Sequence, residues 1–434
     1  MKNNNEGTTS VSTKARTRQI MLALVLGIFT GMVCNYAVPE IAQAKNIASY
    51  FAIVSDVFLH MIKMIIAPLV FATIVTGIAA MGHSGGAVRR VACRALGWFV
   101  LASLMSLGIG MIFSNLLIPG TGLGLPLPSV AETTNLATGA FNLKDFIGHI
   151  VPTSVVQALA SNEILQIVVF SIFLSSALGA LGNTGAQSLM VVVGELVPVM
   201  LKVTDYVMRF APLGVFAAIA SVVTVQGIGI LITYSKFVGT FYLASAALWV
   251  LLILIGRLIL GSSVFRLTKS LQEPMAIAFS TASSEAAFPA MFEQLRRYGV
   301  SERIAAFVLP LGYSFNLAGS MIYQAVATLF VAQAYDIQLS LSSQLSMLLL
   351  MMVTSKGVAG VPRASLVVVA ATLPLFGLPA SGMLLILGID QFLDMGRALT
   401  NVLSNGIATA VVAKWEDELE VTQSDMLKQS ERAS

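Results

Sequence analysis

The chain has 434 residues, of which 56% are hydrophobic and 11% are charged, with a formal net charge of +4. Because a soluble domain carries about 25% charged residues, this composition excludes a soluble protein and predicts one that crosses the bilayer several times. The basic residues are spread among the loops and form no patch, which argues against a nucleic-acid partner.

Apolar segments long enough to cross a bilayer, which takes roughly 20 residues, follow a predicted cytosolic tail at 1–17. The first could pass for a signal peptide, but it is too long for the apolar region of one, and many more segments follow it. We therefore expect an uncleaved first helix and six transmembrane helices within residues 18–260. Their predicted positions are 20–38, 47–80, 95–118, an interrupted region at 146–182, 188–225 and 233–260.

The distribution of positive charge predicts the orientation of these helices. Basic residues dominate the first 18 positions and the loop 83–94, whereas the segment 119–163 is mainly acidic. Since cytosolic loops are enriched in Lys and Arg, we expect both termini in the cytosol and 119–163 outside. Trp98 and Trp415 fall at predicted cytosolic helix ends, where we expect them to anchor the membrane interface.

After residue 260 the apolar segments are interrupted by small and polar residues. The interruptions "STASSEAAFPA", "YSFNLAGSMIY" and "TSKGVAGVPRAS" lie in 261–299, 302–335 and 341–378. They free backbone groups that lipid cannot satisfy, so they belong where the chain is buried in protein or lines a watery cavity. Paired interruptions point to a transporter's binding site. We predict a hairpin, a broken helix, a second hairpin and a final helix as the core region, 261–415, followed by a cytosolic tail at 416–434.

The final helix carries a polar stripe where a membrane helix usually carries leucines. In "GIDQFLDMGRALTNVLSNG", residues 388–406, the polar residues recur at helical spacing and share one face. An ionisable side chain inside the membrane costs roughly 2.5–3.5 kcal/mol, so the stripe is a candidate binding site. The sequence leaves open an Asp394–Arg397 pair that satisfies itself and fixes helix packing. The stripe consists of Asp390, Asp394, Arg397, Asn401, Ser404 and Asn405.

The two predicted hairpin turns add further candidates. Ser283 and Ser284 lie where the first hairpin would turn, so their hydroxyl groups and freed N–H groups can bind an anion. The alternative is that they are small residues that let helices pack. Glu285 is a candidate proton carrier unless a nearby basic group pairs with it. Lys356 and Arg363 bracket the second turn, where a water-exposed lip is the simpler interpretation.

The sequence contains no motif of an enzyme or a metal site. It has no HExxH, no GxSxG elbow and no Walker loop, and its three histidines are scattered. We therefore expect no enzymatic activity, no cofactor and no bound metal. Asp56, His60 and Lys63 share one face of the second helix, and we interpret them as packing or interfacial contacts.

The motifs of the core region resemble those of the dicarboxylate/amino acid:cation symporter family, which has the glutamate-transporter fold. The similarity runs from residue 18 to residue 416 and is densest in "STASSE", "GYSFNLAGS", "TSKGVAGVP" and "DMGRALTN…NGIATAVVAKWE". Within the family, the chain looks most like bacterial proton-coupled glutamate/aspartate carriers and next most like C4-dicarboxylate carriers.

This resemblance implies an all-α polytopic membrane protein with eight transmembrane helices and two re-entrant hairpins. The hairpins would have opposite orientations and lie near 262–297 and 341–375. It also implies a homotrimer in the bacterial inner membrane. In each copy, a transport domain would move like an elevator against a static scaffold.

The resemblance also implies roles for individual residues. Arg397 matches the arginine that binds the substrate's side-chain carboxylate, and Asp394 matches the aspartate that binds its amino group. C4-dicarboxylate carriers usually lack a carboxylate at the second position, so Asp394 favours an amino acid as substrate. The remaining predicted substrate-binding residues are Ser283, Ser284, Ser320, Val361, Arg363 and Asn401.

Several residues depart from the family's pattern. Ala318 and Asn405 stand where sodium-coupled members carry aspartates, so two anionic oxygen ligands for Na⁺ are missing. Gln324 stands where mammalian members carry a glutamate implicated in proton transport, Arg363 replaces a small residue and Ala398 replaces a threonine. We therefore expect H⁺ rather than Na⁺ as the coupling ion. The predicted coupling positions are Glu285, Asn316, Asp390, Asp394 and Asn405.

The sequence thus predicts a secondary-active symporter that imports glutamate or aspartate and is driven by protons. One alternative is a carrier of C4-dicarboxylates or other organic anions with the same fold. Another, from a different functional class, is a substrate sensor or anion conductance without coupled uptake. The expected partners are a small acidic substrate, the lipid bilayer and further copies of the chain.

Overall fold

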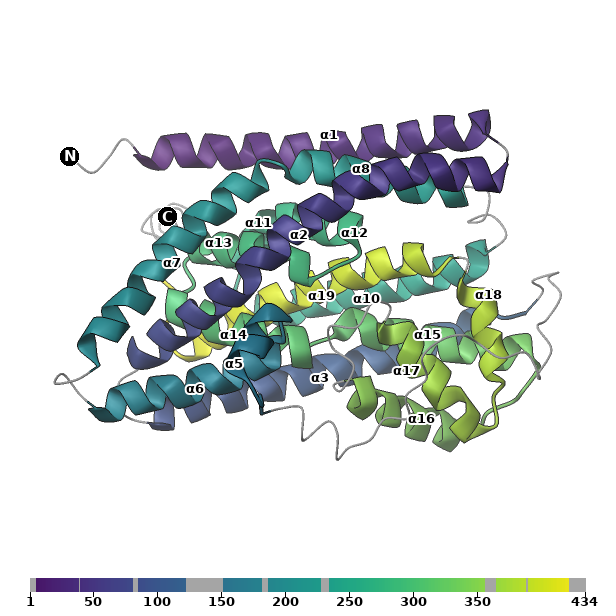
Figure 1. Ribbon diagram of the computed structural model, residues 1–434. Helices are drawn as coiled ribbons and strands as arrows, with labels where there is room; N and C mark the ends of the chain where they lie inside the picture. The colour runs from purple at the N-terminus through teal and green to yellow at the C-terminus, as the bar shows by residue number, and fades with distance from the viewer. Residues whose placement is uncertain are drawn as a thin grey trace, which may run out of the picture.

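The computed structural model describes residues 5–420 except 39, 81–84, 122–150, 182–185, 228–233, 356–363 and 388. The described residues fold into helices and include no β-strand beyond one isolated bridge between Val300 and Leu419. Both α1 (Asn5–Ala37) and α19 (Asp390–Trp415) reach the same end of the molecule, where α1 begins and α19 ends (Figure 1).

The first half of the described chain consists mainly of long apolar helices. They are α2 (Ile41–Ala80), α3 (Gly85–Leu117), α5 (Val155–Ala160), α6 (Ile164–Leu181), α7 (Gln187–Met208), α8 (Ala211–Gln226) and α10 (Ser235–Leu260). Helix α1 already begins at Asn5, so residues 5–17 of the predicted tail continue the first helix. The single helix predicted over 188–225 is two helices, because Arg209 and Phe210 form a turn and Pro212 lies in the first turn of α8. Proline favours that position, where the helix needs no N–H donor.

The second half has shorter helices. They are α11 (Ser263–Ser270), α12 (Gln272–Thr281), α13 (Phe288–Tyr298), α14 (Glu302–Phe315), α15 (Ala318–Ala334), α16 (Leu341–Thr354), α17 (Ala364–Thr372) and α18 (Met383–Leu387). Short 3-10 turns cover Glu285–Ala287, Leu373–Phe376 and Ala380–Gly382. Helix α12 contacts α13, and α16 contacts α17, the two helix pairs in which the sequence predicts hairpins.

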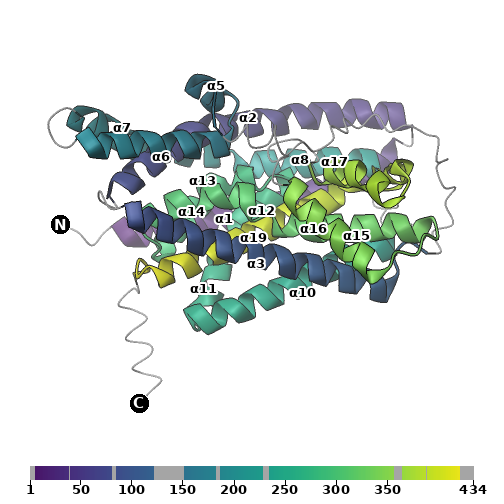
Figure 2. The ribbon, with the colours of Figure 1, turned by 90° about the horizontal axis from the view of Figure 1, so that it is seen from below.

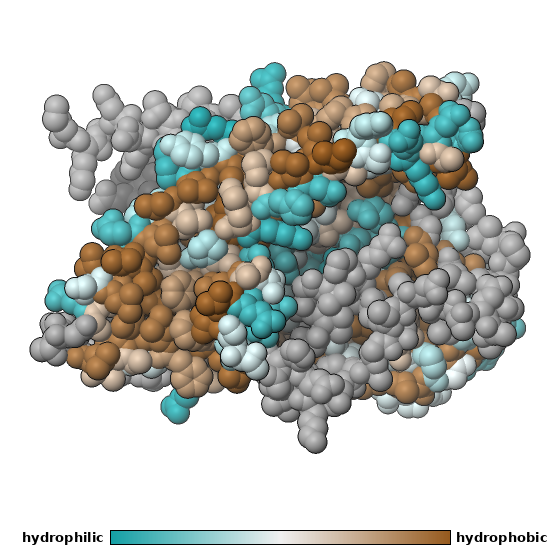
Figure 3. All heavy atoms as spheres, viewed as in Figure 1, coloured by the Kyte–Doolittle hydropathy of each residue, from teal (hydrophilic) through white to brown (hydrophobic). Residues whose placement is uncertain are grey.

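Within the described residues, six helical segments are long and apolar enough to cross a membrane. They are Arg18–Ala37, Ile41–Thr76, Val88–Leu117, Gln187–Met208, Ser235–Leu260 and Glu302–Ala334. Helices α6, α8 and α16 are apolar but shorter. Apolar side chains gather on the outside of α6 and α7 in Figure 3, as a lipid-facing surface would require.

The helices pack as two groups. In the first, α8 lies along α1 and α2, and α6 and α7 pack on α2. Gly27 and Gly31 let α1 approach α8 closely, since a Cβ atom at either would come within 2.7 Å of an α8 atom. In the second group, α3, α10, α12, α14 and α15 all contact α19, which is therefore the central helix (Figure 1). The groups meet where α14 packs on α2 and α12 packs on α8.

Trp98 is not at a helix end. It lies well inside α3, is 3% exposed, and its ring meets the Trp415 ring edge to face at 5.9 Å. The expected interfacial anchor is therefore wrong for Trp98, because α3 begins ten residues before the predicted start.

Candidate functional site

The predicted broken helix breaks at Asn316 and Leu317, between α14 and α15. A helix that starts in the protein interior leaves its first N–H groups without partners inside the helix. The Oδ1 atom of Asn401, on α19, accepts one of them from Gly319 at 2.8 Å. Gly319 permits this approach, because a Cβ atom there would lie 2.2 Å from the Arg397 carbonyl oxygen. The first turn of α15 thus packs directly against the backbone of α19.

A cluster of amide and hydroxyl groups holds the other side of the break. The Asn316 side chain donates from Nδ2 to Asn405 Oδ1 at 2.9 Å and accepts at Oδ1 from the Ser404 hydroxyl at 3.2 Å. All three residues are buried. The far half of the predicted polar stripe therefore contacts the broken helix, and its side chains satisfy groups that the break exposes.

Asp394 and Arg397 form the accessible part of the stripe. Arg397 donates from Nε to Asp394 Oδ1 and from Nη1 to the Ser320 hydroxyl at 3.3 Å. Their side chains keep 13% (Arg397) and 11% (Asp394) exposure, whereas Asn401 and Asn405 are at most 1% exposed. The pair anticipated as a self-satisfying alternative does form, and its two side chains are more exposed than those of Asp390, Asn401 and Asn405 in the same stripe.

Two buried amide groups near this pair have atoms without hydrogen-bond partners among the described residues. They are Nδ2 of Asn401, one turn beyond Arg397, and Nδ2 of Asn405. Buried polar atoms nearly always have a partner. A carboxylate placed beside Arg397 would find a further donor in Asn401.

Asp390 begins α19 and is 1% exposed; its Oδ1 accepts a hydrogen bond from the Tyr323 hydroxyl at 2.6 Å. Asp390 was predicted from the polar stripe, whereas Tyr323 was not. Two aromatic residues of α10 that hold α19 were not predicted either: Tyr242 donates to the Phe392 carbonyl at 2.7 Å, and Trp249 donates to the Thr400 hydroxyl at 3.0 Å. Their spacing of seven places both on one face of α10, a signal that was available, although it names no partner.

The first hairpin turns at the predicted serines. Ala282 takes the left-handed conformation with φ of 52°, and the Ser283 hydroxyl accepts the Ala286 N–H at 3.2 Å, in the 3-10 turn that precedes α13. Ser284 is buried and Glu285 is half-buried. At the opposite end of α13, the Tyr298 hydroxyl bonds to the Ser263 hydroxyl of α11 at 2.8 Å.

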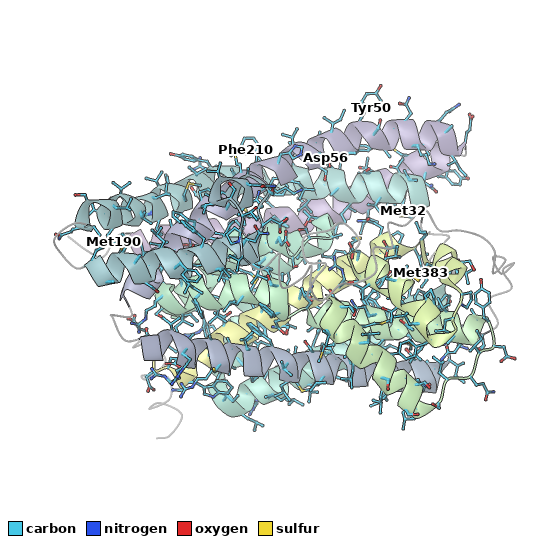
Figure 4. All side chains as sticks on the ribbon, turned by 60° about the horizontal axis from the view of Figure 1, so that its bottom comes forward. Met32, Tyr50, Asp56, Met190, Phe210 and Met383 are labelled. Carbon is cyan, nitrogen blue, oxygen red and sulfur yellow. The ribbon has the colours of Figure 1, made fainter. Side chains whose placement is uncertain are left out.

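The turn of this hairpin lies against α19 beside the Asp394–Arg397 pair. Met395 packs in one apolar cluster with Phe279 and Ala282. The Glu285 carboxylate lies within electrostatic range of two basic side chains, Arg397 and Lys63 of α2, and of the acidic Glu163. Lys63, His60 and Asp56 are all exposed, and Figure 4 shows Asp56 at the edge of the molecule opposite α3.

The turn of the second hairpin falls in 356–363, outside the described residues, and so do the predicted positions Lys356, Val361 and Arg363. Among the predicted site residues, hydrogen bonds join Asn316 to Asn405 and join Ser320, Arg397 and Asp394 in a chain. Asn401 bonds to the Gly319 N–H and Asp390 to Tyr323. Ser283, Ser284 and Glu285 lie in the turn of the first hairpin, where Ala282 packs with Met395 of α19. Among the described residues, no group of three His, Cys, Asp or Glu side chains could hold a metal ion.

Such an arrangement of a hairpin turn, a broken helix and a charged pair inside a helical membrane protein defines a transporter. A model of the sodium:dicarboxylate symporter family matches residues 17–415. The chain belongs to this family, which confirms the resemblance seen in the motifs: it is a multi-pass membrane transporter and not an enzyme.

Several curated relatives align along nearly the whole chain. The proton/sodium-glutamate symport protein of Geobacillus stearothermophilus is 36% identical over 407 residues, 92% of this chain and 94% of the relative. The C4-dicarboxylate transport protein of Rhodospirillum rubrum is 38% identical over 408 residues, 93% and 88% respectively. That of Geobacter sp. strain M21 is 37% identical over 421 residues, 95% and 94% respectively. Relatives of two substrate classes are thus similarly distant.

Proposed function

We propose that the protein imports acidic amino acids, glutamate or aspartate. The observation that carries this proposal is the Asp394–Arg397 pair, a carboxylate and a guanidinium side by side in the most exposed part of the stripe. An acidic amino acid carries the complementary set, an ammonium group and two carboxylates. Arg397 presents a planar fork suited to a carboxylate, and Asp394 offers an acceptor for the ammonium group.

The remaining contacts follow from the residues around the pair. The Ser283, Ser284 and Ser320 hydroxyl groups and the unpartnered Nδ2 of Asn401 can donate to the second carboxylate. Val361 and Arg363 stay predicted contacts from the second hairpin. A C4-dicarboxylate is the second candidate, because relatives of comparable identity are named as its transporters. A C4-dicarboxylate has no ammonium group that could bind to Asp394.

Protons are the proposed coupling ion. A sodium site needs several oxygen ligands, preferably anionic, and the cluster at the helix break offers the neutral side chains of Asn316, Ser404 and Asn405. These groups already bond to one another, which supports a break that is held without a cation. Glu285 and Asp394, both beside Arg397, are the proposed proton-carrying groups, with Asp390 as a third coupling position.

The two groups of helices support the proposed mode of movement. The group of α1, α2, α6, α7 and α8 would be the scaffold, and the group around α19 would carry substrate like an elevator. We further propose eight transmembrane helices, hairpins that enter from opposite faces, and a homotrimer in the bacterial inner membrane. Both termini would face the cytosol, at the end where α1 begins and α19 ends.

Uptake into proteoliposomes that contain the pure protein tests the proposal. Labelled L-glutamate or L-aspartate should accumulate under an inward proton gradient, with no change when Na⁺ or K⁺ is added. If succinate or malate is carried and aspartate neither is carried nor competes, the protein is a dicarboxylate carrier instead. Sodium-dependent uptake would overturn the proton coupling. Substrate binding without accumulation would indicate the sensor or conductance.

A further inference from the structure

Helix α10 lies beside α19 (Figure 2) and packs on the side of it that faces away from Asp394. A helix turns by about 100° per residue, so Gly396 lies about 200° around the axis from Asp394. A Cβ atom at Gly396 would lie 2.7 Å from Phe241 Cε1 and 2.8 Å from Tyr242 Cε1. Because glycine has no side chain, two aromatic rings of α10 pack directly on the backbone behind the charged pair.

The first turn of α19 begins at a residue that cannot cap it. The helix starts at Asp390, and Ile389, at the N-cap position, has an apolar side chain that cannot accept a hydrogen bond. Helix ends fray, and Asp394 lies only one turn from this end. Contacts from other helices must therefore hold the turn that leads to Asp394.

Two tyrosines supply these contacts. Tyr242 of α10 donates to the Phe392 carbonyl at 2.7 Å, and Tyr323 of α15 donates to Asp390 Oδ1 at 2.6 Å. The Phe241 ring meets the Tyr242 ring at 5.2 Å and the Tyr323 ring at 6.4 Å, both edge to face. We call Phe241, Tyr242 and Tyr323 the aromatic clasp. It holds the first turn of α19 from two helices.

A second hold from α10 lies beyond Arg397. Trp249 donates from Nε1 to the Thr400 hydroxyl at 3.0 Å, three residues after Arg397. The carbonyl that Tyr242 binds lies two residues before Asp394. The two bonds from α10 therefore bracket the charged pair, with Tyr242 nearer to the carboxylate and Trp249 nearer to the guanidinium.

We propose that Tyr242 is a specificity-determining residue, which keeps Asp394 in position for the ammonium group of an amino acid. The inference rests on the proposed function, in which Asp394 binds that group. Because its hydroxyl bonds to the Phe392 carbonyl, Tyr242 acts through α19 and is a positioning residue. Its loss should weaken the binding of an amino acid. A dicarboxylate, which binds to Arg397 but has no ammonium group, should bind as before.

The test compares Tyr242→Phe with two matched variants, by titration calorimetry of the purified protein with L-aspartate and with succinate. Tyr242→Phe should bind L-aspartate about three- to tenfold more weakly, as the net loss of one hydrogen bond predicts, and succinate within about twofold of wild type. Trp249→Phe should change both affinities by the same factor. Tyr298→Phe removes a tyrosine hydroxyl bonded to Ser263, away from the pair, and should change neither.

A double variant tests whether Tyr242 acts through Asp394. If it does, adding Tyr242→Phe to Asp394→Asn should weaken L-aspartate binding no further, whereas independent effects would multiply. Three results would each overturn the proposal: equal weakening of both substrates by Tyr242→Phe, an unchanged affinity for L-aspartate, or multiplied losses in the double variant. The same selectivity shift in Trp249→Phe would overturn the assignment to the first turn.

Hydrogen exchange separates the hold on α19 from the choice of substrate. Residues 392–396 should exchange their amide hydrogens faster in Tyr242→Phe than in wild type or Tyr298→Phe, whichever substrate the protein carries. Unchanged exchange would show that Tyr242 does not hold the first turn. If wild type binds succinate but not L-aspartate, the proposed function is wrong, and the role of Tyr242 in selecting an amino acid is overturned with it.

Discussion

Helix α7 and the broken helix α14–α15 have the same mean hydropathy but opposite surroundings. In the apolar window of α7, 17% of the residues are buried; in that of Glu302–Ala334, 89% are. Helix α7 turns Val191 and Val192 outward, whereas α15 keeps Ser320 and Gln324 inside. Hydropathy identifies both as membrane segments. The small and amide residues of α14–α15 identify that segment as the one buried in the centre of the protein. Lipid accepts valine readily but not an amide.

The largest expected effect comes from the centre of the buried group. Arg397→Ala removes the partner of Asp394 and the donor to Ser320, and an unpaired buried charge costs about 3–5 kcal/mol. Uptake of acidic substrate should fall by about 100-fold or more, with membrane insertion intact. Arg209→Ala, at the exposed end of α7, is the control and should retain wild-type uptake. Normal uptake by the Arg397→Ala variant would show that the stripe is not part of the binding site.

A pair of glycines tests the contrast in packing. A Cβ atom at Gly319 would lie 2.2 Å from the Arg397 carbonyl, whereas one at Gly194, in α7, would lie 3.9 Å from Thr76 Cγ2. We expect Gly319→Ala to force α15 away from α19, with a loss of about 1–3 kcal/mol as for other overpacked cores. Gly194→Ala should be neutral or gain about 0.5–1 kcal/mol in helix propensity. Thermal melting of both variants in detergent measures this, and equal melting temperatures would contradict the packing described here.

The smallest effect is expected on the outer face. Val192 is 65% exposed on α7, and Val192→Ala should alter stability by less than about 0.5 kcal/mol and uptake by less than twofold. The same melting and uptake assays apply. A loss as large as that of Gly319→Ala would show that this face is covered by protein, as a second copy of the chain would cover it.

Much of the central architecture was predictable because its signals are local. The spacing of Asp394, Arg397 and Asn401 fixes one helix face, and "YSFNLAGS" breaks the helix at Asn316. What those side chains bind was not predictable. The contacts of Asn401 with Gly319 and of Asn405 with Asn316 join residues 82 and 89 positions apart, and helical periodicity carries no information on such distances.

The errors have local causes too. The segment 188–225 is apolar on both sides of Arg209 and Phe210, so it was predicted as one helix. Pro212 was the available signal that a second helix starts there. Trp98 was expected at an interface because a helix predicted to begin at residue 95 puts its ring at a helix end. Helix α3 instead begins at Gly85, and Trp98 is buried against the ring of Trp415.

The most direct test of the account is the affinity of Asp394→Asn for two substrates, measured by titration calorimetry on the purified protein. A hydrogen bond to a charged group contributes about 1.5–3 kcal/mol, so L-aspartate should bind about 10- to 100-fold more weakly than to wild type. Succinate, which has no ammonium group, should bind with unchanged or higher affinity. Unchanged affinity for L-aspartate would contradict the central claim that Asp394 and Arg397 together select an acidic amino acid.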